Sequence, residues 1–324
     1  MHNSPPLSRY TSHRPMATMH VLDTNWTGRP RSIAASLLLG DGQAALVDPG
    51  PASTLETLRG KLRGHGLGVA DLDAVLLTHI HLDHAGAAGS LVRENPRLAV
   101  YVHRNGAAHM ADPAKLLTSA GRLYGDNLYR LFGDFLAVPA QNLRILDGGE
   151  VLAMGGRKLE VVYTPGHASH HVSFMDATEG LAFVGDTTGM RIQGDGFVLP
   201  VTPPPDIDLE IWEKSLAAII ERHPTRLFLT HFGFSEDVAG HIGEFRERLH
   251  RWADLTAELV RSGEEEAKAL SAFVAAVRAE VEKALPEEEA GHYVFNGGLE
   301  LSWLGLARYW RKRATATAGS AGVR

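Results

Sequence analysis

Four metal-binding side chains crowd into one short segment of the chain, His79-Ile80-His81-Leu82-Asp83-His84. Neutral imidazole nitrogens and carboxylate oxygens are ligands that zinc, iron and manganese accept in proteins. Three histidines and one aspartate at fixed offsets form a compound pattern, which is far more specific than a merely polar loop. The segment therefore predicts a site for a divalent metal.

The predicted elements around this segment would place the ligands at the edge of a sheet. Residues 73–78 (DAVLLT) have the apolar run of a buried strand, and the small residues 85–89 (AGAAG) are typical of a tightly packed helix start. In open α/β sheets, the carboxyl ends of strands face a crevice in which ligands bind. We therefore expect the four ligands to lie in such a crevice.

Three further segments carry ligand-type residues directly after a predicted strand. They are Thr164-Pro165-Gly166-His167 after residues 157–163, Gly185-Asp186 after residues 181–184, and Thr230-His231 after residues 226–229. Each is a weak signal by itself, since a single loop histidine is usually a plain polar residue. Because the same position at a strand end recurs, we predict that these residues join the first segment in one site.

The four motifs resemble, in this order, those of the metallo-β-lactamase superfamily: THIHLDHAG (78–86), TPGH (164–167), GD (185–186) and TH (230–231). The resemblance covers residues 20–235. It implies an α/β fold, a four-layer αββα sandwich with a two-metal site at one edge. It also implies the ligands, which are His79, His81 and His167 for one ion, Asp83, His84 and His231 for the other, and Asp186 as the bridge.

The cofactors implied by the resemblance are two divalent ions, zinc in the first place and iron or manganese as alternatives. Two such ions about 3.5–4 Å apart share a water and lower its pKa toward neutrality, which gives a hydroxide nucleophile. Asp83 is the predicted catalytic residue, since it can orient this hydroxide and shuttle its proton. Ligating histidines need an outer partner for the second ring nitrogen. The candidates are Asp48 and His171, and His171 fits a plain strand-edge position equally well.

Departures from the better-known branches of the superfamily narrow the activity. The chain has no cysteine, which the commonest zinc β-lactamases use as a ligand. It has Gly189 where quorum-quenching lactonases have a tyrosine, and His170 where glyoxalase II thioesterases have a glycine. A general hydrolase branch fits best, and the resemblance then implies cleavage of a lactone, ester, thioester or phosphotriester in a small molecule.

Two other functions remain open from the sequence. Persulfide dioxygenases, which are oxidoreductases, share the motifs but hold a single iron, here on His79, His167 and Asp186. A binding module that has lost its activity is the other alternative, and the full set of ligands argues against it.

Composition excludes several classes of partner. The net charge of −6 argues against a nucleic-acid surface, which would normally be basic. No apolar run approaches the length of a membrane span, and the N-terminal residues lack the apolar core of a secretory signal. The absence of cysteine excludes disulfides and fits a cytoplasmic protein. We expect a small-molecule substrate, no nucleic acid and no membrane.

The chain divides by composition into a central domain with helical additions. We expect a flexible tail at 1–17, the metallo-β-lactamase-like domain at 18–237 with a helical insertion at 104–142, a helical C-terminal extension at 238–313 and a disordered tail at 314–324. Apolar residues every three or four positions predict helices at 238–259, 265–285 and 298–313, with a break at Pro286 and residues 287–289. Packing or a homodimer surface is the expected role of this extension.

An apolar substrate pocket is the last expectation. Tyr124, Tyr129, Phe132 and Phe135 have the spacing of one helix face in the insertion, which is either a packing element or a lid beside the metal loop. The predicted pocket residues are Tyr124 and Phe135 from the insertion, with Met190 and Phe197 from the loop after Asp186.

Overall fold

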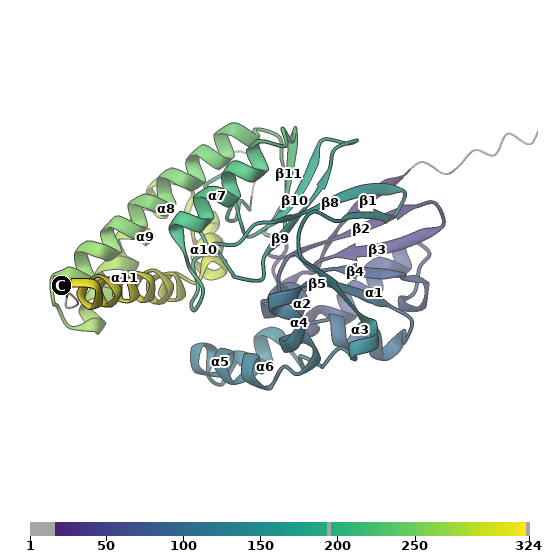
Figure 1. Cartoon of the computed structure of the whole chain (residues 1–324), viewed down its shortest axis with the longest axis horizontal. Coiled ribbons are helices and arrows are strands. Elements are labelled where there is room, and N and C mark those ends of the chain that lie inside the picture. The colour runs from purple at the N-terminus through teal and green to yellow at the C-terminus, as the bar shows by residue number, and fades with distance from the viewer. Residues whose placement is uncertain (1–16, 193–195, 322–324) are drawn as a thin grey trace, which may run out of the picture.

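Two mixed six-stranded sheets form the centre of the computed structural model, which describes residues 17–192 and 196–321 (Figure 1). The first sheet has the order β1-β2-β3-β4-β5-β6, antiparallel from β1 to β3 and parallel from β3 to β6. Its strands are β1 Thr18–Asp23, β2 Ala34–Gly40, β3 Gln43–Val47, β4 Ala74–Leu76, β5 Ala99–His103 and β6 Leu143–Leu146.

Helices connect the parallel strands of the first sheet, because parallel neighbours require a crossover. The helix α1 (Leu55–Gly64) joins β3 to β4. The helices α2 (Leu82–Ala85) and α3 (Ala88–Glu94) join β4 to β5. The insertion between β5 and β6 holds α4 (Arg104–Ala111), α5 (Ala114–Tyr124) and α6 (Asn127–Phe132).

The second sheet has the order β12-β11-β10-β9-β8-β7, and only the β10–β11 pair is parallel. Its strands are β7 Val151–Met154, β8 Arg157–Tyr163, β9 Val172–Asp176, β10 Leu181–Gly185, β11 Arg226–Leu229 and β12 Gly233–Ser235. The helix α7 (Leu209–Ile220) forms the crossover between β10 and β11.

Alternating side chains on the strands create four layers. Because successive strand residues point to opposite faces of a sheet, Leu38 of β2 packs between the two sheets while Leu37 packs against the helices of the first sheet. In the second sheet, Phe174 of β9 packs between the sheets, and Met175 packs on the outer helix side. Helices α1 and α3 cover the first sheet, and α7 and α8 (Val238–Arg261) cover the second (Figure 1). The predicted αββα sandwich is confirmed.

The insertion differs from the single helix face predicted for its aromatic residues. Its helices α5 and α6 end at Tyr124 and Phe132, so Tyr124 lies on α5, Tyr129 and Phe132 lie on α6, and Phe135 lies on neither helix. The rings of Tyr124 and Phe132 pack edge to face at 4.8 Å, whereas Tyr129 is 68% exposed. Phe135 lies beyond α6 and is buried.

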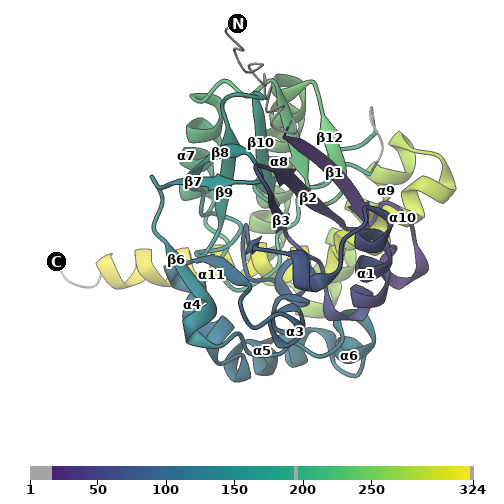
Figure 2. The same ribbon diagram turned by 90° about the vertical axis from the view of Figure 1, so that its right-hand side faces the viewer.

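The C-terminal extension continues with α9 (Glu266–Ala284), α10 (Glu287–Gly297) and α11 (Leu299–Ala321), which Figure 2 shows from the side. The predicted break at Pro286 is confirmed, because α9 ends at Ala284 and the backbone is extended at Leu285, but residues 287–289 belong to the first turn of α10. Proline is tolerated at a helix start, and acidic side chains in the first turn favour the helix dipole. The helix α11 runs past the predicted end at Arg313 and covers residues 314–321 of the predicted disordered tail.

The predicted N-terminal tail 1–17 lies outside the described residues except for its last residue. Among the residues that the structure describes, no helix is both long and apolar enough to cross a membrane.

We expect Phe174→Ala to lower the free energy of unfolding by about 3–5 kcal/mol, because the ring is fully buried between the two sheets. Chemical denaturation measures this loss. Phe234→Ala on β12 is the matched control, and its loss should be clearly smaller because Phe234 is 39% exposed. Equal losses in the two variants would contradict the inter-sheet core.

Candidate metal centre

The buried carboxylate of Asp48 ties together three segments of the site. Asp48 follows β3 in the left-handed backbone region (φ 47°), which aspartate tolerates better than most residues. Its Oδ1 accepts from the backbone N–H of Thr78 (2.8 Å), and its Oδ2 accepts from the hydroxyls of Thr78 (2.7 Å) and Thr230 (2.9 Å). Oδ2 also accepts from Nδ1 of His84 at 2.9 Å. Asp48 therefore fixes the segments that follow β4 and β11 relative to α2.

Three histidines converge on one point at the ends of β4 and β8. The Nε2 atoms of His79 and His167 each lie 3.0 Å from Nδ1 of His81. The outer nitrogens of two of these rings have partners, since Nδ1 of His79 is 3.1 Å from the Thr78 hydroxyl and Nδ1 of His167 donates to the carbonyl oxygen of Val201 at 2.9 Å. The three inward nitrogens form a group that could hold a metal ion.

A second group forms beside the first one from Asp83, His84 and His231. Oδ2 of Asp83 lies 3.2 Å from Nε2 of His231 and 3.7 Å from Nε2 of His84. The outer nitrogen of His231 donates to the carbonyl oxygen of Ser32 at 2.8 Å, and that of His84 is held by Asp48. Each imidazole in this group therefore presents Nε2 to the common point.

Asp186, which follows β10, lies between the two groups. Its Oδ2 is 3.5 Å from Nε2 of His167 and 4.0 Å from Nε2 of His79. Its Oδ1 is 3.2 Å from Nε2 of His84 and 3.6 Å from Nε2 of His231. One carboxylate oxygen faces each group, which is the arrangement expected of a ligand shared by two ions. The structure thus brings all seven predicted metal ligands together.

Two buried atoms at the centre of the site lack ordinary partners. Nε2 of His84 and Oδ1 of Asp186 make no hydrogen bond within the described structure, although both are inaccessible to solvent. An unsatisfied buried polar atom costs free energy, and a cation between these atoms would remove that cost. Imidazole and carboxylate donors together suit zinc, iron or manganese better than calcium. The residues present therefore fit divalent metal ions.

The electrostatics of the site separate two classes of histidine. Burial, together with the neighbouring imidazoles, lowers the pKa of His79 well below its usual range, and burial lowers the pKa of His81 to about 3. Burial also lowers the pKa of His84, but the carboxylates around it outweigh burial and raise its pKa well above the usual range. Burial raises the pKa of Asp83, but the charges of His84 and His231 lower it to about 2. Asp83 is therefore ionised at neutral pH.

His171 does not hold the outer nitrogen of a ligating histidine, contrary to one of the two predicted roles. It is fully buried, and its Nε2 accepts from the backbone N–H of Asp186 at 3.3 Å. Its Nδ1 lies 3.0 Å from the hydroxyls of Thr164 and Thr187. A Cβ on Gly185, at φ 48°, would lie 2.6 Å from Nε2 of His171, so only glycine fits here. His171 thus positions the backbone of the bridging residue.

Comparison with known proteins agrees with this geometry. The family model described as the metallo-beta-lactamase superfamily matches residues 28–231. The chain belongs to the metallo-β-lactamase superfamily. A metallo-beta-lactamase fold-containing protein of Sulfurisphaera tokodaii is 27% identical over 223 residues, which are 68% of this chain and 80% of that protein. Its solved structure, described as an archaeal superfamily member, has a TM-score of 0.64 at 23% identity and covers 90% of this chain and 99% of its own.

Two other relatives carry names that refer to hydrolysis. The probable metallo-hydrolase YqgX of Bacillus subtilis is 32% identical over 157 residues, which are 48% of this chain and 66% of that protein. Hydroxyacylglutathione hydrolase of Xylella fastidiosa (strain M23) is 28% identical over 152 residues, which are 47% of this chain and 43% of that protein. This chain therefore matches less than half of the glutathione-dependent enzyme.

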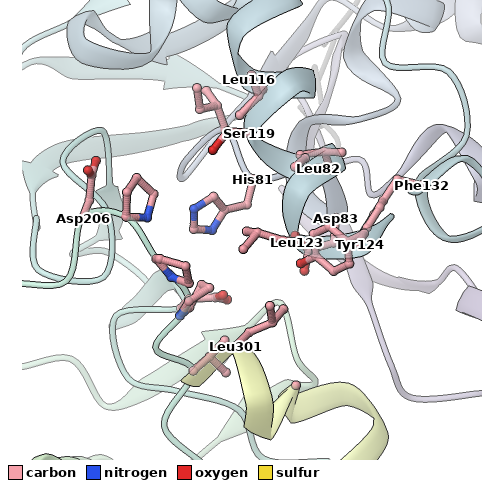
Figure 3. A pocket seen from close by; sticks show the side chains of 18 of the residues that line it. His81, Leu82, Asp83, Leu116, Ser119, Leu123, Tyr124, Phe132, Asp206 and Leu301 are labelled. Atoms are coloured by element: carbon pink, nitrogen blue, oxygen red, sulfur yellow. The ribbon is translucent and has the colours of Figure 1, made fainter. Parts of the chain in front are cut away.

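In this superfamily member, the metal centre opens into a cavity of about 400 Å³ (Figure 3). His81, Asp83, Asp186 and His231 line its inner end. The helices α5 and α6 of the insertion line one side, and α10 and α11 of the C-terminal extension line another. The Pro203–Pro205 turn completes the wall. The prolines lie next to Val201, whose carbonyl oxygen orients His167.

Of the four predicted pocket residues, only Tyr124 lines this cavity. Phe135 is buried in the core between the first sheet and its helices. Met190 and Phe197 are buried in the core of the second sheet and the C-terminal helices. Their apolar character indicated burial correctly, but the assignment of Phe135, Met190 and Phe197 to the pocket is wrong.

The sequence analysis missed the contribution of the C-terminal extension to the cavity. Phe295 and Leu301 line the cavity from α10 and α11, although the extension was assigned to packing or dimerisation. One signal was available in Gly305. Glycine is unfavourable inside a helix, and a Cβ on Gly305 would lie 2.0 Å from the carbonyl oxygen of Thr202. This glycine lets α11 approach the proline turn closely.

We expect Asp48→Asn to weaken the binding of zinc by about 10–100-fold, because an amide cannot replace a carboxylate that accepts four hydrogen bonds around the ligands. Competition with a chelator of known affinity measures the change. Asp237→Asn is the matched control, since Asp237 caps α8 from an exposed position and asparagine caps equally well. Unchanged affinity in Asp48→Asn would exclude the anchoring role.

Metal binding should release protons and tighten as the pH rises. Burial lowers the pKa of His84 and of His231, but the surrounding carboxylates outweigh burial and raise both pKa values above the usual value, so these imidazoles hold their protons more tightly in the metal-free protein than free imidazole does. Ligation requires the neutral form. Calorimetry in buffers of different ionisation enthalpy measures the proton release, and an affinity that is independent of pH between about 6 and 8 would contradict the expectation.

Proposed function

We propose that this chain is a binuclear metallo-hydrolase that cleaves an ester-type bond in a small molecule. The observation that carries the proposal is the position of the Asp186 carboxylate, which directs one oxygen toward each of two groups of ligands. Lactones, esters, thioesters and phosphotriesters share an electrophilic centre with a polar oxygen, and all four belong to the proposed range. Zinc is the first choice for the metal, with iron or manganese as alternatives.

Two divalent ions, when bound, would polarise the substrate oxygen and lower the pKa of a shared water. His79, His81 and His167 would hold the first ion, and Asp83, His84 and His231 would hold the second. Asp186 would be common to both ions, and its side chain is only 3% exposed. The chain itself supplies rigid placement, because outer hydrogen bonds orient four of the five ligating imidazoles.

Asp83 is the proposed catalytic residue among the ligands. Its side chain is 24% exposed and borders the cavity, whereas the neighbouring His84 is fully buried. A low pKa keeps the Asp83 carboxylate ionised at neutral pH, so it can accept a hydrogen bond from an attacking water and orient that water toward the substrate. Asp186 is more buried and is better suited to hold position than to move a proton.

Two observations outside the metal groups support hydrolysis. Relatives of the chain include a probable metallo-hydrolase and a hydroxyacylglutathione hydrolase, whose names describe that class of reaction. The cavity at the metal centre is also large enough for a small organic substrate, since ligand pockets measure about 300–1,000 Å³.

We expect Asp186→Asn to lower kcat/KM on an ester or lactone by at least about 100-fold, together with loss of the second metal ion, because the shared ligand is removed. Elemental analysis of wild-type protein should give about two zinc, iron or manganese ions per chain. Asp208→Asn is the matched control, since Asp208 caps α7 at Ile211 and lies outside the metal groups.

Two results would contradict the proposal. Full activity of Asp186→Asn would exclude a shared ligand. A single iron per chain, together with oxygen uptake on a persulfide, would replace hydrolysis by the dioxygenase alternative.

A further inference from the structure

The cavity at the metal centre is built largely from segments that lie outside the two sheets. Apolar side chains come from the insertion and from the C-terminal extension, which lie far apart in the sequence. The apolar members from these helices are Leu116, Ala120, Leu123, Tyr124, Leu131, Phe132, Phe295 and Leu301. In Figure 3, Leu116 of α5 and Leu301 of α11 lie on different sides of His81. The reacting end of a substrate would therefore meet the ligands while the rest lies against apolar surface.

Trp26 joins the walls of this cavity. Its indole N–H donates to the carbonyl oxygen of Leu131 at 2.6 Å, and its ring stacks on Phe132 at 5.8 Å. The same ring lies 5.8 Å from the ring of Phe295 on α10, which is covered by the guanidinium of Arg29 at 4.1 Å. Because aromatic contacts connect α6, α10 and the segment before β2, the apolar walls are held in place without a ligand.

Tyr124 adds an uncharged polar group near the metal ligands. Burial, with the carboxylates of Asp83 and Asp186, raises the pKa of Tyr124 above its usual value, so the phenol stays neutral. Its ring rests on Phe132, and Figure 3 shows it beside Asp83. Its hydroxyl can therefore donate a hydrogen bond to a polar oxygen of a substrate.

Away from the metal centre, the walls of the cavity offer few charges that could bind a highly charged substrate. Among the described lining residues other than histidines, Lys115 is the one cation, and it lies exposed on α5. Asp206 is engaged, since it accepts from the hydroxyl of Ser169 at 2.6 Å. A substrate with several carboxylates or phosphates would leave most of them without a partner. Glutathione carries two carboxylates, so its thioesters fit this cavity poorly.

We propose that the substrate is an uncharged ester or lactone with an apolar acyl or alkyl group of several carbons, which lies between α5, α6 and α11. This inference rests on the proposed hydrolase function and adds the substrate class. The ester group lies at Asp83, and the apolar group contacts Leu123 and Leu301. Apolar burial makes chain length the main determinant of the preference among substrates.

Kinetics of the metal-loaded protein on 4-nitrophenyl acetate, butyrate, hexanoate and octanoate test this class. We expect kcat/KM to rise by about two- to fourfold per methylene until the cavity is filled, which corresponds to burial of the added carbons. A hydroxyacyl thioester of glutathione should be a poorer substrate than hexanoate by at least about tenfold.

A pair of variants on α11 locates the apolar group. Leu301→Asn should lower kcat/KM for the octanoate by about tenfold and for the acetate by less than about twofold, with unchanged metal content. Leu304→Asn is the matched control, because Leu304 lies one turn further on the same helix, is 37% exposed and does not line the cavity. Its kinetics should equal those of the wild type.

The kinetics distinguish a wrong substrate class from a wrong assignment as a hydrolase. Cleavage with no dependence on chain length, or preference for the glutathione thioester, would overturn the apolar site and leave hydrolysis intact. If no ester is cleaved, calorimetry with the free carboxylates hexanoate and octanoate still tests whether the cavity binds an apolar chain. We expect octanoate to bind more tightly than hexanoate, and we expect Leu301→Asn to abolish this difference. Equal affinities of the two carboxylates for the wild type would overturn the apolar site.

Discussion

The metal centre depends on one buried carboxylate, that of Asp48, which is 1% exposed. A carboxylate in such a place is costly unless it is hydrogen-bonded on all sides. Its partners are the residue before His79, the residue before His231 and the ligand His84 itself. The same bonds that stabilise the buried charge therefore hold the segments that carry three ligands.

The sandwich aligns the two sheets, which the hydrogen bonds of Asp48 alone cannot do. His79, His81, Asp83 and His84 follow the first sheet, and His167, Asp186 and His231 follow the second. The apolar core between the sheets fixes the positions of these two sets of ligands relative to each other. Asp186 therefore lies close to histidines that follow each of the two sheets. The helical additions then convert an exposed edge into a cavity. The ligands thus come from the edge of the sandwich, and most of the cavity wall comes from the insertion and the extension.

The site was more predictable from the sequence than its surroundings. The ligands lie in short motifs just after β4, β8, β10 and β11, and the resemblance of these motifs to the superfamily was enough to predict them. The strands β1, β7 and β12 lie at sheet edges, and their short or mostly accessible segments lack the apolar run that predicts a central strand. Phe135, Met190 and Phe197 show another limit, since residue type indicates burial but not the core in which a side chain is buried. Pro286 correctly marks the end of α9, but proline also fits the start of a helix, and α10 begins directly after it.

The central claim is that Asp186 joins two metal ions on this chain. Anomalous X-ray diffraction from crystals of the zinc-loaded protein tests it most directly. The account predicts two peaks about 3.5–4 Å apart, one beside His79, His81 and His167 and the other beside Asp83, His84 and His231, with Asp186 between them. A single peak at full zinc occupancy, or two peaks that do not share Asp186, would contradict it.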